Sequence, residues 1–274
     1  MVSPQGFALI TGASSGIGEE FARQLAAQGW SLILVARSQD RLEKVRSELM
    51  STHMGIDVVA IPLDLTTPGA PADLFQRTQA ANLDVEILLN NAGFGAFGEF
   101  ASLDLNRARQ MIDLNIVALV ELAHLYMQPM IQRRRGGIVN IASVAGYAPL
   151  PYSTLYAATK AFVKSFSQAM YEEARQHGVH FMVVNPGSTE SNFFKVAGKS
   201  PFSDPSRMQT SAEVVRESLR AFDRKKSSIV TGTSNRLLIV VLTLLPRRWI
   251  TATVGRVMRR AKVGAPETME QWNE

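Results

Sequence analysis

The sequence alternates short apolar runs with longer segments of helical periodicity, and this alternation constrains the fold more than any other feature. The apolar runs are rich in valine, isoleucine and leucine and lack a period of two, which is typical of strands covered on both faces. A repeated strand–helix–strand order predicts a parallel sheet with helices on both faces and right-handed crossovers. Strands are predicted at 7–11, 31–36, 58–61, 85–89, 138–142 and 180–184, with a seventh at 228–231.

The segments between these runs predict the helices. Their apolar residues recur at a spacing of three and four. No repeat, low-complexity stretch or linker interrupts the chain before residue 232. We therefore expect a Rossmann-like, doubly wound α/β domain over residues 1–232 and a C-terminal helical extension over 233–274. The predicted helices cover 17–28, 39–51, 71–81, 103–132, 154–177 and 211–223.

Composition excludes several kinds of chemistry. The chain has no cysteine, which rules out disulfides, thiolate nucleophiles and cysteine-bound metals. Its four histidines show no metal-ligand spacing, so no metal site is predicted. Residues 1–6 lack the pattern of a targeting segment, and we expect a cytoplasmic protein.

The net charge of +5 is concentrated near the C-terminus. Residues 236–262 contain seven basic residues and no acidic one, whereas the preceding chain is nearly balanced. A local excess of this kind does not indicate nucleic-acid binding. Apolar residues, a tryptophan and basic flanks suit a helix pair that contacts anionic lipid, and packing against another subunit is the alternative that stays open.

A glycine-rich turn lies directly after the first predicted strand. Glycines permit a tight turn and let backbone N–H groups approach a pyrophosphate, while the following helix N-terminus adds positive potential. An ordinary strand-to-helix turn is the alternative, which the position after the first strand makes less favourable. The predicted cofactor-binding residues of this turn are Gly12, Ser14, Ser15, Gly16, Ile17 and Gly18.

The end of the second predicted strand indicates which dinucleotide binds. An acidic residue there binds the ribose 2′-hydroxyl of NAD. This sequence has Arg37 instead, 19 residues after Gly18, and a guanidinium pairs well with a 2′-phosphate. Ser14 offers a further hydroxyl donor. The pattern favours NADP(H), and a solvated surface arginine is the alternative.

Tyr156 and Lys160 are four residues apart in a predicted helix and therefore face the same way. A nearby ammonium stabilises a phenolate and lowers the pKa of the phenol, which makes tyrosine a better proton shuttle. Ser143 ends the fifth predicted strand, at the edge of the sheet where ligands bind. We expect the hydroxyls of Ser143 and Tyr156 to meet at one carbonyl oxygen.

Together these motifs resemble the short-chain dehydrogenase/reductase family over residues 7–191. The resemblance departs mildly at Thr159, Thr189 and Ser191, which keep the hydroxyl or the backbone group. The matching segments are 11–18, 64–65, 90–93, Asn115, 140–143, 156–160 and 186–187.

The resemblance implies a role for each matching residue. Tyr156 is implied as general acid in reduction and base in oxidation, Ser143 as a hydrogen-bond partner of the substrate oxygen, and Lys160 as a ligand of the nicotinamide ribose. Asn115 is implied to hold a water molecule, although a buried asparagine that only bonds to backbone is the alternative. The remaining implied cofactor contacts are Asp64, Leu65, Asn91, Ala92, Gly93, Pro186, Gly187 and Thr189, of which Asn91 has an equally good structural interpretation.

The helices 103–132 and 154–177 are apolar around much of their circumference, so we expect both faces of each to be buried. In the family that the chain resembles these helices pair between subunits, which implies a homodimer or homotetramer.

A substrate lid is expected near 188–210. Clustered apolar residues predict a lipophilic acyl, steroid-like or other apolar ketone, with ordinary core packing as the alternative. A non-catalytic NADP(H)-binding scaffold or sensor remains the second functional hypothesis. The clustered residues are Phe94, Phe97, Phe100, Tyr147, Pro149, Leu150, Pro151, Phe193, Phe194, Val196 and Phe202.

Overall fold

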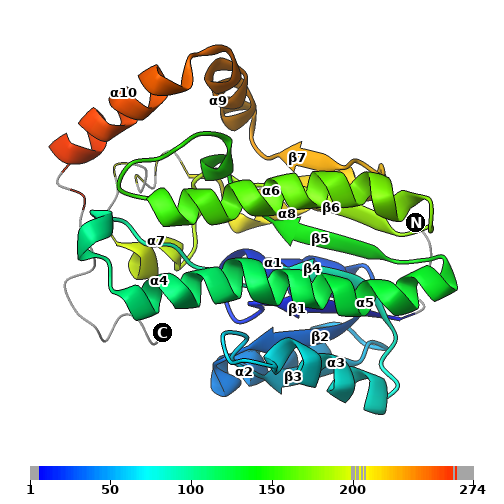
Figure 1. Cartoon of the computed structure of the whole chain (residues 1–274). Helices are drawn as coiled ribbons and strands as arrows, with labels where there is room; N and C mark the ends of the chain where they lie inside the picture. Colours follow the sequence, from blue (N-terminus) through cyan, green and yellow to red (C-terminus); the bar gives the residue numbers. More distant parts are fainter. Residues whose placement is uncertain are drawn as a thin grey trace.

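A computed structural model describes residues 6–198, 201, 204, 206, 208–261 and 263. Its centre is a seven-stranded parallel sheet with the order β3-β2-β1-β4-β5-β6-β7 (Figure 1). The predicted fold class is therefore confirmed. The strands are β1 (Phe7–Thr11), β2 (Ser31–Ala36), β3 (Val58–Pro62), β4 (Val85–Asn90), β5 (Gly137–Ile141), β6 (His180–Asn185) and β7 (Ser228–Val230).

The strand order reverses between β1 and β4. The chain runs outward from β1 to β3 and then returns to pair β4 against the other side of β1. Such a switch point leaves a crevice at the carboxyl ends of the two strands, because their following loops leave in opposite directions. The glycine-rich turn after β1 and the segment 91–93 after β4 meet at this crevice.

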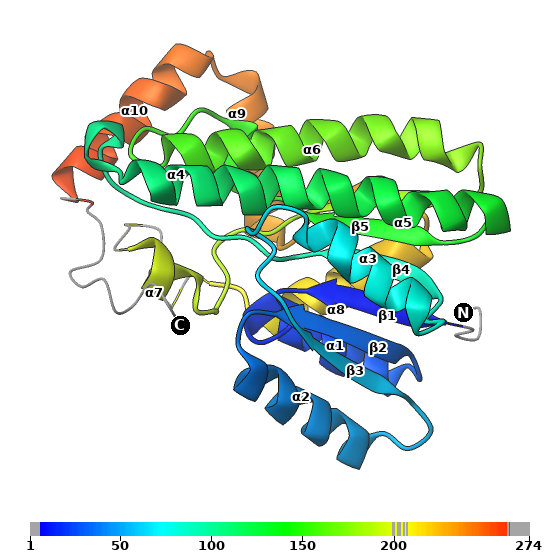
Figure 2. The same ribbon diagram turned by 60° about the horizontal axis from the view of Figure 1, so that its bottom comes forward.

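Helices cover both faces of the sheet (Figures 1 and 2). Ala8 and Ile10 of β1 pack with one helix layer, and Leu9 between them packs with the other. Side chains on successive strand residues point to opposite faces, so a strand buried on both sides is apolar throughout. The first layer contains α1 (Gly16–Ala27), α2 (Gln39–Thr52) and α8 (Ser211–Asp223), and the second contains α3 (Ala70–Ala80), α5 (Leu119–Arg133) and α6 (Thr154–Arg175).

The predicted helix at 103–132 is not uniform. It begins as α4 (Leu105–Ile112), widens into a π-helical segment η2 (Asp113–Ala118) and continues as α5. A short 3-10 turn, η1 (Phe100–Ser102), precedes it. The residues 105–133 are long and apolar enough to cross a membrane by length and composition alone. Leu122, Tyr126 and Met130 are instead buried against the sheet, as in the core helix of a globular domain.

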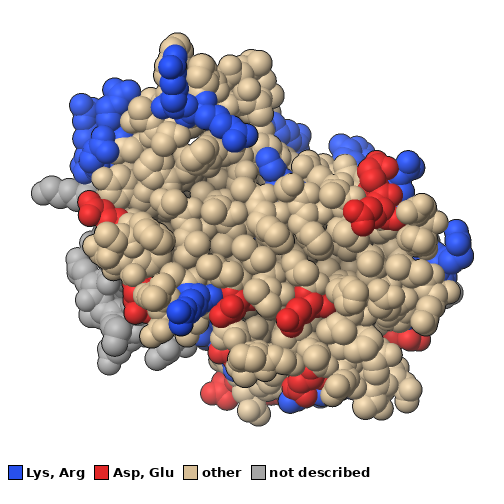
Figure 3. Space-filling view, in the orientation of Figure 1, with Lys and Arg blue, Asp and Glu red and all other residues tan. Residues whose placement is uncertain are grey.

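The C-terminal extension forms two helices, α9 (Thr233–Leu244) and α10 (Arg247–Arg260), separated at Pro246. The boundary predicted at 232 coincides with the start of α9, although the division into domains stays a prediction. Both helices lie over the carboxyl edge of the sheet, near the short helices η3 (Val144–Tyr147) and α7 (Phe193–Ala197) (Figure 1). Figure 3 shows Lys and Arg side chains gathered over α10.

Candidate active site

A cleft of about 830 Å³ lies at the carboxyl edge of the sheet. It extends from the turn after β1, past the ends of β4 and β5, to α9 and α10. Every predicted site residue except Gly18 and Asn115 lines it. Residues from positions 12 to 258 thus meet in one cavity, which is large enough for a dinucleotide and part of a second molecule.

The turn after β1 has the geometry of a phosphate cradle. Gly12 and Gly16 have φ values of +66° and +59°, which favour glycine. A Cβ on Gly18 would lie 2.2 Å from the carbonyl oxygen of Gly12, so this glycine permits α1 to pack against the turn. Ser15 precedes α1 without a side-chain cap bond, which leaves first-turn N–H groups for an anion.

Asn91 holds the crevice between β1 and β4 together. Its side-chain amide donates to the carbonyl oxygens of Thr11 (2.9 Å) and Gly12 (3.2 Å). The hydroxyl of Thr11 accepts from the backbone N–H groups of Asn91 and Ala92, both at 3.0 Å. Asn91, Ala92 and Gly93 also line the cleft, so the structural role of Asn91 is observed and contact with a cofactor stays a prediction.

The end of the cleft beside Arg37 is basic. Arg37 lines the cleft beside Asp64 and Leu65. Arg107 of α4 lines it as well, with its guanidinium carbon 3.7 Å from the ring centroid of Phe94. Burial, and secondarily the charge of Arg37, lower the pKa of Arg107 to about 10. Two neighbouring guanidinium groups on one cleft wall fit an anionic ligand such as a phosphate.

The residues predicted from the sequence did not include Arg107 and Gln110 of α4 or Leu114 of η2. All three line the cleft and are spaced three and four residues apart. That spacing places them on one helix face and is the signal that was available. Nothing in the local sequence indicated that this face looks into the cleft rather than toward solvent.

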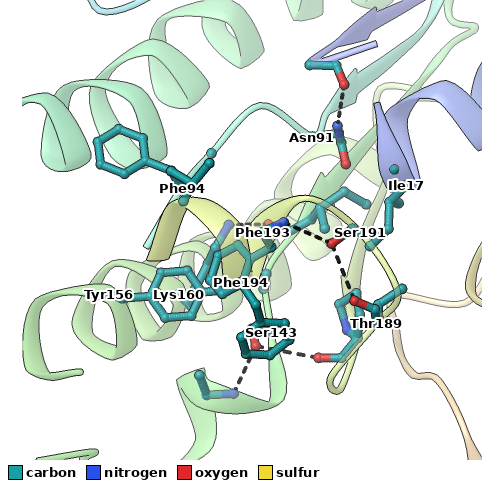
Figure 4. Close-up of a pocket in the computed structure, with 18 of the residues that line it drawn as sticks. Ile17, Asn91, Phe94, Ser143, Tyr156, Lys160, Thr189, Ser191, Phe193 and Phe194 are labelled. Atoms are coloured by element: carbon teal, nitrogen blue, oxygen red, sulfur yellow. Dashed lines mark hydrogen bonds between the residues drawn. The ribbon is translucent and has the colours of Figure 1, made fainter. Parts of the chain in front are cut away.

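Tyr156 and Lys160 of α6 lie next to Ser143, which follows β5 (Figure 4). The hydroxyl of Ser143 accepts from the backbone N–H of Ala145 at 3.1 Å and lies near enough to Tyr156 to lower the pKa of its phenol. The ammonium of Lys160 donates to the carbonyl oxygen of Ile141 at 2.8 Å and lies 5.8 Å from the ring centroid of Tyr156. The structure therefore brings together three of the four residues predicted to carry out catalysis, and the fourth is Asn115.

The expectation that Lys160 makes Tyr156 acidic is wrong for this structure. Burial raises the pKa of Tyr156 to about 12, although the nearby Ser143 hydroxyl opposes the rise. Burial also lowers the pKa of Lys160 to about 8. Removal from water penalises the charged form of each group, and this penalty is the largest cause of both shifts. Tyr156 is consequently a protonated phenol at neutral pH.

Phe193 of α7 covers the ring of Tyr156, with a distance of 5.2 Å between the ring centroids (Figure 4). Gly95 makes this contact possible, because a Cβ there would lie 2.7 Å from Cζ of Phe193. The side chain of Phe193 thus covers part of the phenol ring of the half-buried Tyr156 and contributes to the desolvation that raises its pKa.

Asn115 lies behind the cleft wall rather than on it. Its side chain is 1% exposed and accepts from the backbone N–H of Phe94 at 3.1 Å. Its amide donates to the carbonyl oxygen of Phe94 (2.9 Å) and to the hydroxyl of Thr159 (3.1 Å). These bonds hold the loop after β4 against α6. The implied contact with a water molecule stays a prediction.

The segment after β6 closes another side of the cleft. The carbonyl oxygen of Pro186 accepts from the backbone N–H of Val144 at 2.9 Å. The hydroxyl of Thr189 donates to the carbonyl oxygen of Gly187 at 3.0 Å. A Cβ on Gly187 would lie 2.3 Å from the side chain of Asn235, so this glycine allows α9 to approach.

The far end of the cleft is apolar. Of the predicted apolar residues, Phe100 is 65% exposed outside the cleft, Tyr147 packs under the ammonium of Lys164 at 4.0 Å, and Phe202 lies outside the described residues. The extension adds a wall that sequence analysis missed. The predicted residues that line the cleft are Phe94, Phe97, Leu150, Phe193, Phe194 and Val196, and the added ones are Leu238, Leu242, Ile250, Val254 and Met258.

Comparisons with known proteins agree with this geometry. Residues 6–200 match the family model described as short chain dehydrogenase. The chain is 34% identical over 197 residues to a very-long-chain 3-oxoacyl-CoA reductase of Bos taurus, and the match covers 69% of this chain and 61% of that relative.

Two solved structures resemble the whole chain. A short-chain dehydrogenase from Sphingobium yanoikuyae in complex with NADPH has 31% identity and a TM-score of 0.78, with 97% of this chain and 99% of that one covered. A bulky-bulky ketone specific alcohol dehydrogenase from Comamonas testosteroni has 29% identity and a TM-score of 0.75, with 98% and 99% covered. The family match over most of the chain and the shared sheet lead to one conclusion: this chain belongs to the short-chain dehydrogenase family.

Proposed function

We propose that the protein is an NADP(H)-dependent oxidoreductase that interconverts a bulky lipophilic ketone and its secondary alcohol. The observation that carries the proposal is the grouping of Tyr156, Ser143 and Lys160, which lies in the cleft between a polar, basic end and an apolar end. A cofactor fits the first end and a substrate carbonyl fits the second, with the phenol between them.

Tyr156 moves the proton in this proposal. In reduction its hydroxyl donates a proton to the carbonyl oxygen while the Ser143 hydroxyl donates a hydrogen bond to the same oxygen. In oxidation the phenolate accepts the proton of the alcohol. Bound NADPH supplies the hydride. A pKa of about 12 keeps the phenol protonated at neutral pH, which favours its use as the acid.

Arg37 supports the choice of NADP(H). Its guanidinium replaces the acidic residue typical of NAD sites, and Arg107 adds a second positive charge nearby. The similar structure from Sphingobium yanoikuyae was solved with NADPH. Both observations support a cofactor with an additional phosphate.

The apolar end of the cleft supports a bulky substrate. Aromatic side chains of α7 and aliphatic side chains of α9 and α10 surround it. The similar proteins from Bos taurus and Comamonas testosteroni are named for a very-long-chain 3-oxoacyl-CoA and for ketones with two bulky groups. A carbonyl flanked by a long or wide apolar group is the substrate class that fits these walls.

NADPH oxidation in the presence of a ketone panel tests the proposal. The panel includes long-chain 3-oxoacyl thioesters, ketones with two bulky substituents and small polar ketones, and turnover is expected with the first two classes. Tyr156→Phe should retain NADPH binding but lower kcat by about 10³-fold, because the ring stays and the proton does not.

Tyr171→Phe is the matched control, since Tyr171 lies on the same helix and its hydroxyl bonds only to the carbonyl oxygen of Lys225. This variant should turn over normally. Undiminished turnover by Tyr156→Phe would assign proton transfer to another group. NADPH binding without turnover of any panel member would favour a scaffold or sensor.

A further inference from the structure

The outer face of α9 and α10 is the most apolar exposed surface of the described chain. Leu237, Val240, Val241 and Leu244 form a stripe on α9 at helical spacing and are 67%, 54%, 44% and 79% exposed. Eight of the fifteen exposed large apolar side chains of the described residues lie between 237 and 257. A concentration of this kind marks a surface that contacts another apolar phase.

Positive charge surrounds this stripe. Figure 3 shows blue side chains over α10 beside an uncharged surface over α9. The segment 233–260 has no acidic residue, and none of its α10 arginines forms an ion pair with a described residue. Lys164 of α6 belongs to the same positive region. Burial, and secondarily the nearby charge of Arg247, lower the pKa of Lys164. The exposed α10 arginines are Arg247, Arg248, Arg256, Arg259 and Arg260.

Helix stability does not account for all of these arginines. Arg259 and Arg260 lie in the last turn of α10, where a cation interacts favourably with the helix dipole. Arg247 and Arg248 lie in the first turn, where the dipole repels a cation. Trp249 follows them and is 58% exposed. Cations and an exposed indole beside an apolar stripe are typical of a helix at a lipid interface.

We propose that the outer face of α9 and α10 docks on the surface of an anionic bilayer, with the α9 stripe among the acyl chains and the α10 arginines at the headgroups. A second copy of the chain is a poorer occupant. A two-fold contact through this face would bring the same arginines of both copies together without an acidic residue to pair them.

The inner sides of the same two helices line the cleft. Leu242 of α9 and Ile250, Val254 and Met258 of α10 face it, and Leu238 lines it while remaining 46% exposed. A docked protein therefore holds the apolar end of its cleft next to the lipid. If the proposed function is also correct, this position gives a membrane-dissolved ketone a short path to Tyr156.

Co-flotation with vesicles tests docking without any measurement of turnover. The full chain should float with vesicles of phosphatidylcholine and phosphatidylglycerol, less with phosphatidylcholine alone, and less at high salt. Leu237→Gln/Leu244→Gln should weaken binding by about tenfold or more, because two apolar side chains no longer enter the acyl region. Arg256→Gln/Arg259→Gln/Arg260→Gln should remove most of the preference for phosphatidylglycerol.

Matched changes elsewhere on the surface serve as controls. Met50→Gln/Met54→Gln removes two exposed apolar side chains from α2 and its following turn, and Lys44→Gln/Arg220→Gln/Arg224→Gln removes three exposed cations. Both should float like the wild type. Neither Leu237 nor Leu244 lines the cleft, so their double variant should keep its melting temperature and its NADPH affinity.

Three outcomes would overturn the docking proposal. The wild type could stay in the soluble fraction with anionic vesicles, or the α9 double variant could float as well as the wild type. The third is that the double variant converts an oligomer to a monomer on gel filtration, which would assign the face to subunit contact. If the wild type floats with anionic vesicles but turns over no ketone of the panel, the result counts against the proposed function and leaves the docking proposal intact.

Discussion

At the scale of single residues, we expect Arg37, which directly follows β2, to decide between NADPH and NADH. Arg37→Asp should raise the KM for NADPH by about 10- to 100-fold, because a charge-assisted contact with the 2′-phosphate is replaced by repulsion. The KM for NADH should fall, since an acidic residue there binds a ribose hydroxyl. Steady-state kinetics with both cofactors measure the change.

Lys44→Asp on α2 makes the same charge change at an exposed position and should leave both constants unaltered. An unchanged ratio of the two KM values in Arg37→Asp would mean that Arg37 does not contact the phosphate. Arg107 is then the next residue to substitute, because it places a second guanidinium on the same wall.

Burial of Lys160 makes stability depend on pH. Its pKa is about 8 in the folded protein and about 10.5 in the unfolded chain. Between these values the unfolded chain binds more protons, so the contribution of Lys160 to the free energy of unfolding rises with pH. The rise is about 2 to 3 kcal/mol from pH 8 to 10.5.

Denaturant unfolding of the wild type and Lys160→Met over this pH range checks the sign. The wild type should gain stability relative to the variant as pH increases, because the cost of a buried ammonium disappears. A difference that stays constant with pH would show that the amine has an ordinary pKa in the folded protein.

At the scale of secondary-structure elements, the C-terminal helices add a wall to the open cleft at the sheet edge. Val254 lies on the inner face of α10, among residues that line the apolar end. Val254→Trp should raise the KM for a bulky ketone by about tenfold or more, because the larger side chain occupies substrate volume. The KM for a small ketone and for NADPH should change little.

The neighbouring position supplies the control. Thr253 is exposed on the same helix, so Thr253→Trp adds an equal volume outside the cleft. Equal kinetics for the two variants with the bulky ketone would mean that α10 does not bound the substrate site in solution.

The π-helical segment η2 shows why the long helix is not regular. Asn115 bonds both backbone groups of Phe94 and the hydroxyl of Thr159, so its side chain must point at the loop after β4. Widened turns of this kind commonly accommodate such a requirement at functional sites. The partners are 21 and 44 residues away, and helical periodicity carries no information about them.

At the scale of the whole molecule, local stability should decrease from the sheet centre to the extension. Residues of β1, β4 and β5 are buried on both faces, whereas Ile239 is the one buried residue of α9. Elements with few buried contacts open without global unfolding. Hydrogen exchange should therefore be slowest in these three strands and faster by orders of magnitude in α9 and α10. Equal protection of α10 and β4 would contradict this gradient.

The strand and helix order, the phosphate turn and the spacing of Ser143, Tyr156 and Lys160 were determined by the sequence alone. Each of these features depends on a hydrophobic periodicity or on a backbone conformation within a few residues, so the residue types in that short segment are enough to predict it. The seven strands and the meeting of these three residues follow from that order, because parallel strands end at one edge.

Only the tertiary structure decided the protonation of the site and the walls of the cleft. Spacing predicted an acidic phenol, but burial under Phe193 raises the pKa of Tyr156 and lowers that of Lys160. Arg107 and the inner faces of α9 and α10 reach the cleft through contacts between distant parts of the chain. Desolvation and long-range packing depend on which side chains cover a residue in the folded protein, and these come from distant parts of the sequence.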